Sequence, residues 1–221
     1  MKDFNNADFS GLEVLMNRVI TISRQYATGG REIGKIIGDH YGIPVYDNDL
    51  ISLAAKESGY TENFFEKAED KASNSLIYSI AMGLNVFGSH GYNKEVLSID
   101  DKVFIAQSEI IRKVAKEGPC VIIGRCADYI LREQEKTVNV FLWGQIEARI
   151  KRAIEVYGMS HSKAEENVLK VDKKRSNYYN YHTDRKWGRS DNYDISLQTD
   201  IIGVENSAKL IINYIDSIPG I

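Results

Sequence analysis

Short apolar runs alternate with amphipathic segments along most of the chain. The runs predict five β-strands, because each is either apolar throughout or alternates apolar and polar positions. They lie at residues 18–23, 43–47, 120–124, 137–144 and 192–200. The third run, CVIIG, shows no alternation, which is typical of a strand buried on both faces.

Apolar residues at helical spacing fill the segments between these strands. Helices are predicted at 31–42, 48–59, 145–158, 160–182 and 203–218, and residues 61–117 are mostly helical with a break at 85–95. A helix is also expected between the third and fourth strands. Because strands and helices alternate, they predict an α/β fold with a parallel sheet between layers of helices. Ligands are then expected at the carboxyl ends of the strands.

Length and composition exclude several classes of protein. The 221 residues fit one large domain, with residues 1–17 predicted as a loosely packed arm. No apolar run approaches the roughly 20 residues that span a bilayer, and no signal-peptide pattern opens the chain, so no membrane partner and a cytoplasmic location are predicted. A formal net charge of −3 argues against a general nucleic-acid surface, because such surfaces carry a basic excess.

Cysteine and histidine usage gives no sign of a metal or redox site. Cys120 and Cys126 match neither a C-x-x-C redox pair nor a zinc knuckle, and free thiols are expected. The four histidines show no H-E-x-x-H pattern, which argues against a zinc hydrolase.

Basic residues are nevertheless concentrated late in the chain. Between 149 and 189 they are Arg149, Lys151, Arg152, Lys163, Lys170, Lys173, Lys174, Arg175, Arg185, Lys186 and Arg189. This stretch either meets an anionic small molecule or forms a solvated helix face. The aromatic residues among these cations, Tyr178, Tyr179, Tyr181 and Trp187, suit either the stacking of a base or, as we favour, a packed hinge.

The turn after the first strand is the best phosphate-binding candidate in the sequence. In ITISRQYATGGREIG, Gly29 and Gly30 let backbone N–H groups approach an anion, and the following helix N-terminus adds about half a positive charge. Arg31 would supply the cation that lysine provides in the P-loop pattern G-x-x-x-x-G-K-[ST].

Five stretches in order carry a resemblance to a known family. They are ITISRQYATGGREIG, GIPVYDNDLI, VIIGRCADYIL, VFLWGQIEARIKRAIE and VDKKRSNYYNYHTDRKWGRSDNYDISLQTD. Together they resemble the cytidylate kinase-like family, a branch of the P-loop nucleoside monophosphate kinases, over about residues 18–216.

The resemblance implies a three-layer α/β/α fold with a five-stranded parallel sheet and three working parts. The core would comprise residues 18–60, 118–160 and 191–221, a helical insert at 61–117 would bind the acceptor, and a lid would span about 161–190. The implied activity is phosphoryl transfer from ATP, with Mg²⁺, to a nucleoside monophosphate, CMP or dCMP first.

The same resemblance assigns roles to individual residues. Donor phosphates would bind at Thr28, Gly29, Gly30 and Arg31, and the acceptor at Asp47, Asp49 and Arg125. The lid cations would be Arg149, Arg152, Lys174, Arg175 and Arg185. Arg31, Arg175 and Arg185 would stabilise the charge of the transferring group.

Two departures from the family pattern leave alternatives open. The P-loop lysine and its neighbouring Ser/Thr are absent, with Gly30 or Arg31 at the lysine place, and Ile123 replaces the aspartate of the motif DGR. Glu32 and Asp128 are the candidates for holding Mg²⁺ instead. A catalytically weak module that binds or senses a nucleotide is therefore the alternative, and an RNA-binding domain is a third that the acidic charge disfavours.

Overall fold

The computed structural model describes residues 18–47 and 99–219. Their elements in chain order are β1 (Val19–Arg24), α1 (Gly30–Tyr41), β2 (Val45–Tyr46), α5 (Ile99–Glu117), β3 (Cys120–Ile123), α6 (Ala127–Ile130), β4 (Thr137–Trp143), α7 (Ile146–Glu155), α8 (His161–His182), the 3-10 turn η2 (Ser190–Asn192), β5 (Ile195–Gln198) and α9 (Thr199–Ser217). The predicted helix at 48–59 and the part of the predicted insert before residue 99 lie outside the described residues.

All five predicted strands join one parallel sheet in the order β2-β3-β1-β4-β5. The central strand β1 pairs with β4 from Val19↔Thr137 to Arg24↔Leu142. Because the strands are parallel, β1, β2 and β3 end at one edge, where Arg24, Asp47 and Gly124 lie close together. The predicted α/β/α fold with a five-stranded parallel sheet is confirmed.

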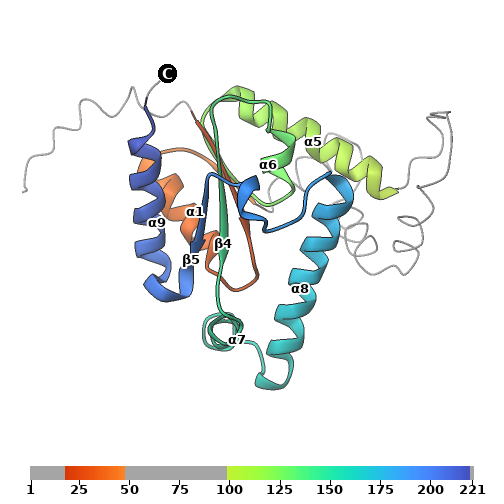
Figure 1. Cartoon of the computed structure of the whole chain (residues 1–221), viewed down its shortest axis with the longest axis vertical. Helices are drawn as coiled ribbons and strands as arrows, with labels where there is room; N and C mark the ends of the chain where they lie inside the picture. The colour runs from red at the N-terminus through yellow and green to blue at the C-terminus, as the bar shows by residue number, and fades with distance from the viewer. Residues whose placement is uncertain (1–17, 48–98, 220–221) are drawn as a thin grey trace, which may run out of the picture.

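Helices cover both faces of the sheet (Figure 1). On one face α1 and α9 pack on buried residues that include Ile20, Ile22 and Val140. On the other face α5 and α6, with Tyr178 and Tyr179 of α8, close a second cluster around Val19 and Ile122. No helix in the described ranges is long and apolar enough to cross a membrane.

Both cysteines belong to the second cluster. Cys120 on β3 and Cys126 after it are free and buried. Burial raises the pKa of the Cys120 thiol to about 11 and raises that of Cys126 well above its usual value. The predicted free thiols are confirmed, and their raised pKa makes them poor nucleophiles at neutral pH.

The structure differs from the predicted elements at several ends. The helix expected between β3 and β4 is the four-residue α6, and β5 covers only 195–198 of the predicted 192–200. Asp194 is not part of the strand, because its carboxylate accepts a hydrogen bond from the Asn139 backbone N–H (2.7 Å). The last helix begins at Thr199, earlier than predicted, and its backbone breaks at Gly203 (φ 77°).

Candidate active site

The turn between β1 and α1 depends on a glycine. Gly29 precedes α1 with φ of 79°, a left-handed conformation that L side chains rarely adopt. A Cβ there would also lie 2.4 Å from Val204 Cγ2. The Thr28 hydroxyl closes the turn by donating to the Gln25 carbonyl (2.9 Å). No side chain caps the first turn of α1, so its N-terminal N–H groups are suited to an anion.

A cavity of about 350 Å³ lies against this turn, and we call it the loop cavity. Every residue from Arg24 to Glu32 lines it, together with Tyr157 and Arg175. The four predicted donor-site residues, Thr28 to Arg31, are therefore on the wall of one cavity.

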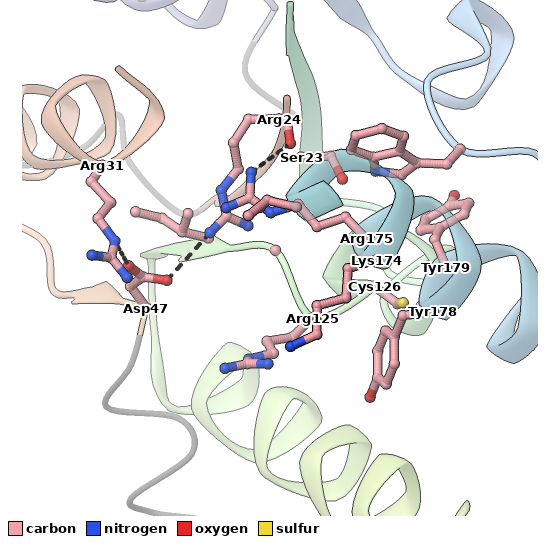
Figure 2. Close-up of a pocket in the computed structure, with 14 residues that line it drawn as sticks. Ser23, Arg24, Arg31, Asp47, Arg125, Cys126, Lys174, Arg175, Tyr178 and Tyr179 are labelled. Atoms are coloured by element: carbon pink, nitrogen blue, oxygen red, sulfur yellow. Dashed lines mark hydrogen bonds and ion pairs between the residues drawn. The ribbon is translucent and has the colours of Figure 1, made fainter. Parts of the chain in front are cut away.

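A second cavity of about 240 Å³ lies at the carboxyl ends of β1, β2 and β3, and we call it the strand-end cavity (Figure 2). It is lined by Ser23, Arg24, Arg31, Asp47, Ile123, Gly124, Arg125, Cys126, Val171, Lys174, Arg175, Tyr178, Tyr179 and Trp187. Five of these side chains are cationic and one is a carboxylate. Arg24, Arg31 and Arg175 line both cavities, so the two share a cationic wall.

Asp47 is the acid of this cluster. Its carboxylate forms ion pairs with Arg31 and, at 3.6 Å, with Arg24, and Figure 2 shows the three side chains converging. The predicted acceptor residue is thus joined to the predicted donor residue Arg31. The other predicted acidic residue, Asp49, lies outside the described residues.

Arg125 lines the strand-end cavity from an unusual turn. Gly124, Arg125 and Cys126 have φ of 79°, 58° and 56°, three left-handed residues in succession. Non-glycine residues are uncommon in this region, and such strain persists mostly at functional sites. The turn supports the prediction that Arg125 has a functional role.

Helix α8 supplies the far wall of the strand-end cavity. Lys174, Arg175, Tyr178 and Tyr179 line it, and Arg175 Nη1 donates to the carbonyl oxygen of Arg24 (3.1 Å). Burial lowers the pKa of both Lys174 and Arg175. Helix α8, which the sequence predicts to carry lid cations, is therefore hydrogen-bonded to the end of β1 in this structure.

The aromatic residues at this wall pack against neighbouring side chains. Tyr179 is buried and its hydroxyl donates to Asp128 Oδ2 (2.6 Å). Trp187 meets the ring of Phe141 edge-on, with centroids 5.4 Å apart. The Tyr178 hydroxyl donates to Gln107 Oε1 on α5 (3.0 Å), which joins α8 to the end of the predicted insert.

The other predicted lid arginines do not line either cavity. Arg149 is buried, where it pairs with Asp172 (2.5 Å) and donates to the Gly144 carbonyl (3.0 Å), so it connects α7 to α8. Arg152 pairs with Glu32 at the start of α1 (2.9 Å).

Arg185 also lies away from both cavities. Its guanidinium carbon is 5.6 Å from the ring centroid of Tyr129. To stabilise the transferring phosphoryl group as predicted, Arg185 would have to move, together with the segment after α8, toward the cavities.

Glu32 is the better fit of the two magnesium candidates. It lines the loop cavity, and its Oε2 is buried without a hydrogen-bond partner, while Oε1 pairs with Arg152. Asp128 lines neither cavity and is engaged by Tyr179. Magnesium in phosphoryl-transfer sites usually takes one or two carboxylates plus substrate phosphates, so one carboxylate suits it. The described residues contain no cluster of three His, Cys, Asp or Glu.

Sequence reasoning missed Arg24. It stands at the end of the first strand, where the P-loop pattern begins with glycine, so the pattern predicts no cation at this position. A signal was present, since Arg24 directly follows the first predicted strand and Gly124 ends the third, and the carboxyl ends of parallel strands lie at one edge of a sheet. A Cβ at Gly124 would lie 2.1 Å from Arg24 Nη1.

Comparisons with known proteins bear on the family and the fold of the chain. The sequence matches the cytidylate kinase-like family over residues 19–201. No curated protein sequence matches the chain. An uncharacterised protein from Eubacterium ventriosum ATCC 27560, of known structure, shares 28% identity with a TM-score of 0.67, over 91% of this chain and 99% of that one.

Two shikimate kinases share the fold at lower identity. The enzyme from Bacteroides thetaiotaomicron has 10% identity and a TM-score of 0.53, over 90% of this chain and 98% of its own. The Acinetobacter baumannii enzyme, solved with shikimate, has 13% identity and a TM-score of 0.50, over 95% and 98%.

Proposed function

Because the chain belongs to the cytidylate kinase-like family, we propose that it transfers the γ-phosphoryl group of ATP to a nucleoside monophosphate, with CMP or dCMP as the first candidates. In this reaction a phosphate oxygen of the acceptor forms the new P–O bond, and the bond between the γ-phosphorus and the β–γ bridging oxygen breaks. The products are ADP and a nucleoside diphosphate.

The shared cationic wall between the two cavities carries this proposal. Phosphoryl transfer needs a donor and an acceptor in line, with positive charge around the group that moves between them. The loop cavity and the strand-end cavity are adjacent, and Arg24, Arg31 and Arg175 line both. A group that passes from one cavity to the other would stay in contact with arginines.

The donor and acceptor sites follow from the same arrangement. The turn from Thr28 to Arg31 would bind the donor phosphates in the loop cavity. Arg125 would bind the acceptor phosphate in the strand-end cavity, and Asp47 would accept hydrogen bonds from the acceptor once its arginines hold phosphate.

We assign the lid to the region of α8. Lys174 and Arg175 would close over the transferring group, and water excluded by closure could not compete as acceptor. Arg149 and Arg152 would act as supports, since they tie α7 to α8 and to α1.

Glu32 would hold Mg²⁺ together with the donor phosphates. When bound, the ion neutralises part of the charge on the β- and γ-phosphates. Glu32 is also tied to Arg152, which keeps its carboxylate at the loop cavity.

A panel of acceptors tests the proposal. ADP formation is measured with ATP and Mg²⁺ and, in turn, CMP, dCMP, UMP, AMP and non-nucleotide acceptors, alongside calorimetric titration of ATP. We expect CMP or dCMP to raise turnover above the hydrolysis background. If ATP binds and no acceptor raises turnover, the protein is instead a nucleotide-binding or sensing module, which the absent lysine would explain.

Arg31→Ala tests the donor site. Arg31 is a cation of the loop cavity, so we expect ATP affinity to fall by about 1.5–3 kcal/mol, the usual range for a hydrogen bond to a charged group. Lys35→Ala, an exposed cation one turn further along α1, is the matched control and should leave ATP affinity unchanged. Equal ATP affinity of Arg31→Ala and the wild type would remove Arg31 from the site.

A further inference from the structure

We infer that Arg24, fixed at the end of the central strand, binds the phosphoryl group as it passes between the two cavities and takes the place of the absent P-loop lysine. The inference rests on the proposed function and adds to it a residue outside the predicted site. Arg24 remains protonated throughout and forms no covalent bond.

The position of Arg24 distinguishes it from the other two shared arginines. Arg31 lies on the exposed side of α1, with 62% of its side chain exposed, whereas 15% of the Arg24 side chain is exposed. Arg175 comes from α8, which we assign to the lid. Arg24 comes from the strand in the middle of the sheet, so it is the shared cation whose place does not depend on closure.

Two glycines make room for this side chain. A Cβ on Gly30 would lie 3.0 Å from Arg24 Cγ, and a Cβ on Gly124 would lie 2.1 Å from Nη1. The stem is thus confined by the first residue of α1 and the guanidinium by the turn after β3. Such a channel holds the planar fork in one place, which favours a fixed two-point contact with phosphate oxygens.

The charges around Arg24 favour an anion. Burial lowers the pKa of its guanidinium well below the ordinary value, and the neighbouring Arg175 lowers it further. Within the part of the chain that the structure describes, its one ion pair is with Asp47, at 3.6 Å, beyond the range of a good hydrogen bond. The Asp47 carboxylate also pairs with Arg31, so Arg24 does not have it to itself.

This weak pairing of Arg24 is informative about function. A protein that needed Arg24 only for its fold would pair it closely, because a poorly paired buried cation costs stability. Arg24 lies on the wall between the cavities that we assign to donor and acceptor. The transferring phosphoryl group would supply the close negative charge that Asp47 does not give it.

The test uses the full-length chain and two substitutions, Arg24→Met and Arg24→Lys. Calorimetric titration with inorganic tripolyphosphate measures anion binding without any need for turnover. We expect Arg24→Met to raise the Kd for tripolyphosphate about 10- to 100-fold, as loss of a charged hydrogen bond does. Arg24→Lys, which keeps the charge and loses the fork, should lie between Arg24→Met and the wild type.

The matched control is Arg18→Met, just before the opposite end of β1. Arg18 lines neither the loop cavity nor the strand-end cavity, so its loss should change the Kd less than about 2-fold. Thermal unfolding distinguishes a role of Arg24 in anion binding from a role in stabilising the fold. A binding role predicts that Arg24→Met unfolds at the wild-type temperature or above it, because a desolvated charge is removed.

The outcomes separate this inference from the proposed function. If wild type and Arg24→Met bind tripolyphosphate equally, or if the wild type does not bind it, Arg24 does not have the inferred role. Where the wild type forms ADP with an acceptor, Arg24→Met should also lower kcat about 10-fold or more, and an unchanged kcat would overturn the inference alone. A third outcome is that no acceptor gives turnover while Arg24→Met has a higher Kd for tripolyphosphate than the wild type. That result would overturn the proposed function and keep the anion site.

Discussion

At the scale of single residues, a buried polar contact behind the site joins Tyr179 to Asp128. Both side chains are buried, and the O–H···O distance is 2.6 Å. Burial raises the pKa of the Asp128 carboxyl, and the hydrogen bond from Tyr179 acts in the opposite direction. The contact fixes α8 over α6, so it positions the helix that lines the strand-end cavity.

Removing one hydroxyl tests this contact. Tyr179→Phe leaves the buried Asp128 carboxyl with its backbone donors but without its side-chain donor, and we expect the free energy of unfolding to fall by about 1–3 kcal/mol. Urea denaturation measures it. Tyr41→Phe is the matched control, because Tyr41 also donates to a carboxylate, Asp216 (2.7 Å), but at a water-accessible place.

Water can replace the lost partner of Asp216, so the control should cost less than about 1 kcal/mol. Equal losses in the two variants would show that the Tyr179 contact adds nothing beyond an exposed one.

At the scale of elements, the backbone conformation of the turn after β3 leaves the space in which the Arg24 guanidinium lies. Gly124 has φ of 79°, and the Arg24 guanidinium occupies the space where a side chain would start. A substitution there therefore acts twice, through backbone strain and through displacement of the arginine.

Gly124→Ala compared with Gly42→Ala separates the two effects. Gly42 at the end of α1 has a φ of 64°, and a Cβ there would meet no atom within 4 Å, so Gly42→Ala carries the backbone strain alone, about 1 kcal/mol of unfolding free energy. Gly124→Ala should lose more stability and should weaken tripolyphosphate binding, which calorimetry detects. Unchanged binding in Gly124→Ala would mean that Arg24 does not need this space.

The elements themselves were largely predictable from the sequence. Apolar runs such as VITIS and CVII report burial directly, which is why every strand was found. The ends of the elements were harder to predict. Asp194 leaves the strand through a hydrogen bond with Asn139, 55 residues away, and Gly203 breaks the helix through its backbone conformation, and neither is contained in the periodicity.

Site residues that follow predicted strands could be predicted from the sequence. Ion pairs between residues far apart in the sequence could not. Gly29, Gly30 and Arg125 follow strands, so their place at the carboxyl edge could be inferred. The partners of Arg149 and Arg152, Asp172 and Glu32, are 23 and 120 residues away in sequence, and no local pattern indicates such pairs.

At the scale of the whole molecule, the two predicted closing parts contact each other. His182 at the end of α8 stacks on Phe104 of α5, with ring centroids 4.2 Å apart and planes within 9°. Burial lowers the pKa of His182 to about 4, while Asp101 acts to raise it. The described end of the predicted insert and α8, which we assign to the lid, are therefore joined by a histidine that burial keeps neutral at pH 7.

Acid should loosen this junction. A histidine whose pKa is lower in the folded state than in the unfolded state, about 6.5, stabilises the fold fully above that pH. The contribution is lost as the pH falls from about 6.5 to about 4. His182→Gln should therefore show a smaller loss of stability across this window than the wild type, by roughly 1–3 kcal/mol.

Thermal unfolding from pH 7.5 to pH 4 measures the effect. His161→Gln, at the exposed start of the same helix, is the control and should follow the wild-type profile. Parallel profiles for His182→Gln and the wild type would contradict a neutral, buried His182.

Because both native thiols are buried, the whole chain can be labelled selectively at an introduced cysteine. Cys120 and Cys126 are its only cysteines, and burial leaves both slow to react with maleimides at neutral pH. A fluorophore could therefore be attached to one cysteine introduced at Leu169, an exposed position on α8, with the native pair left in place. Emission from that dye during nucleotide addition would report, in real time, whether the helix moves.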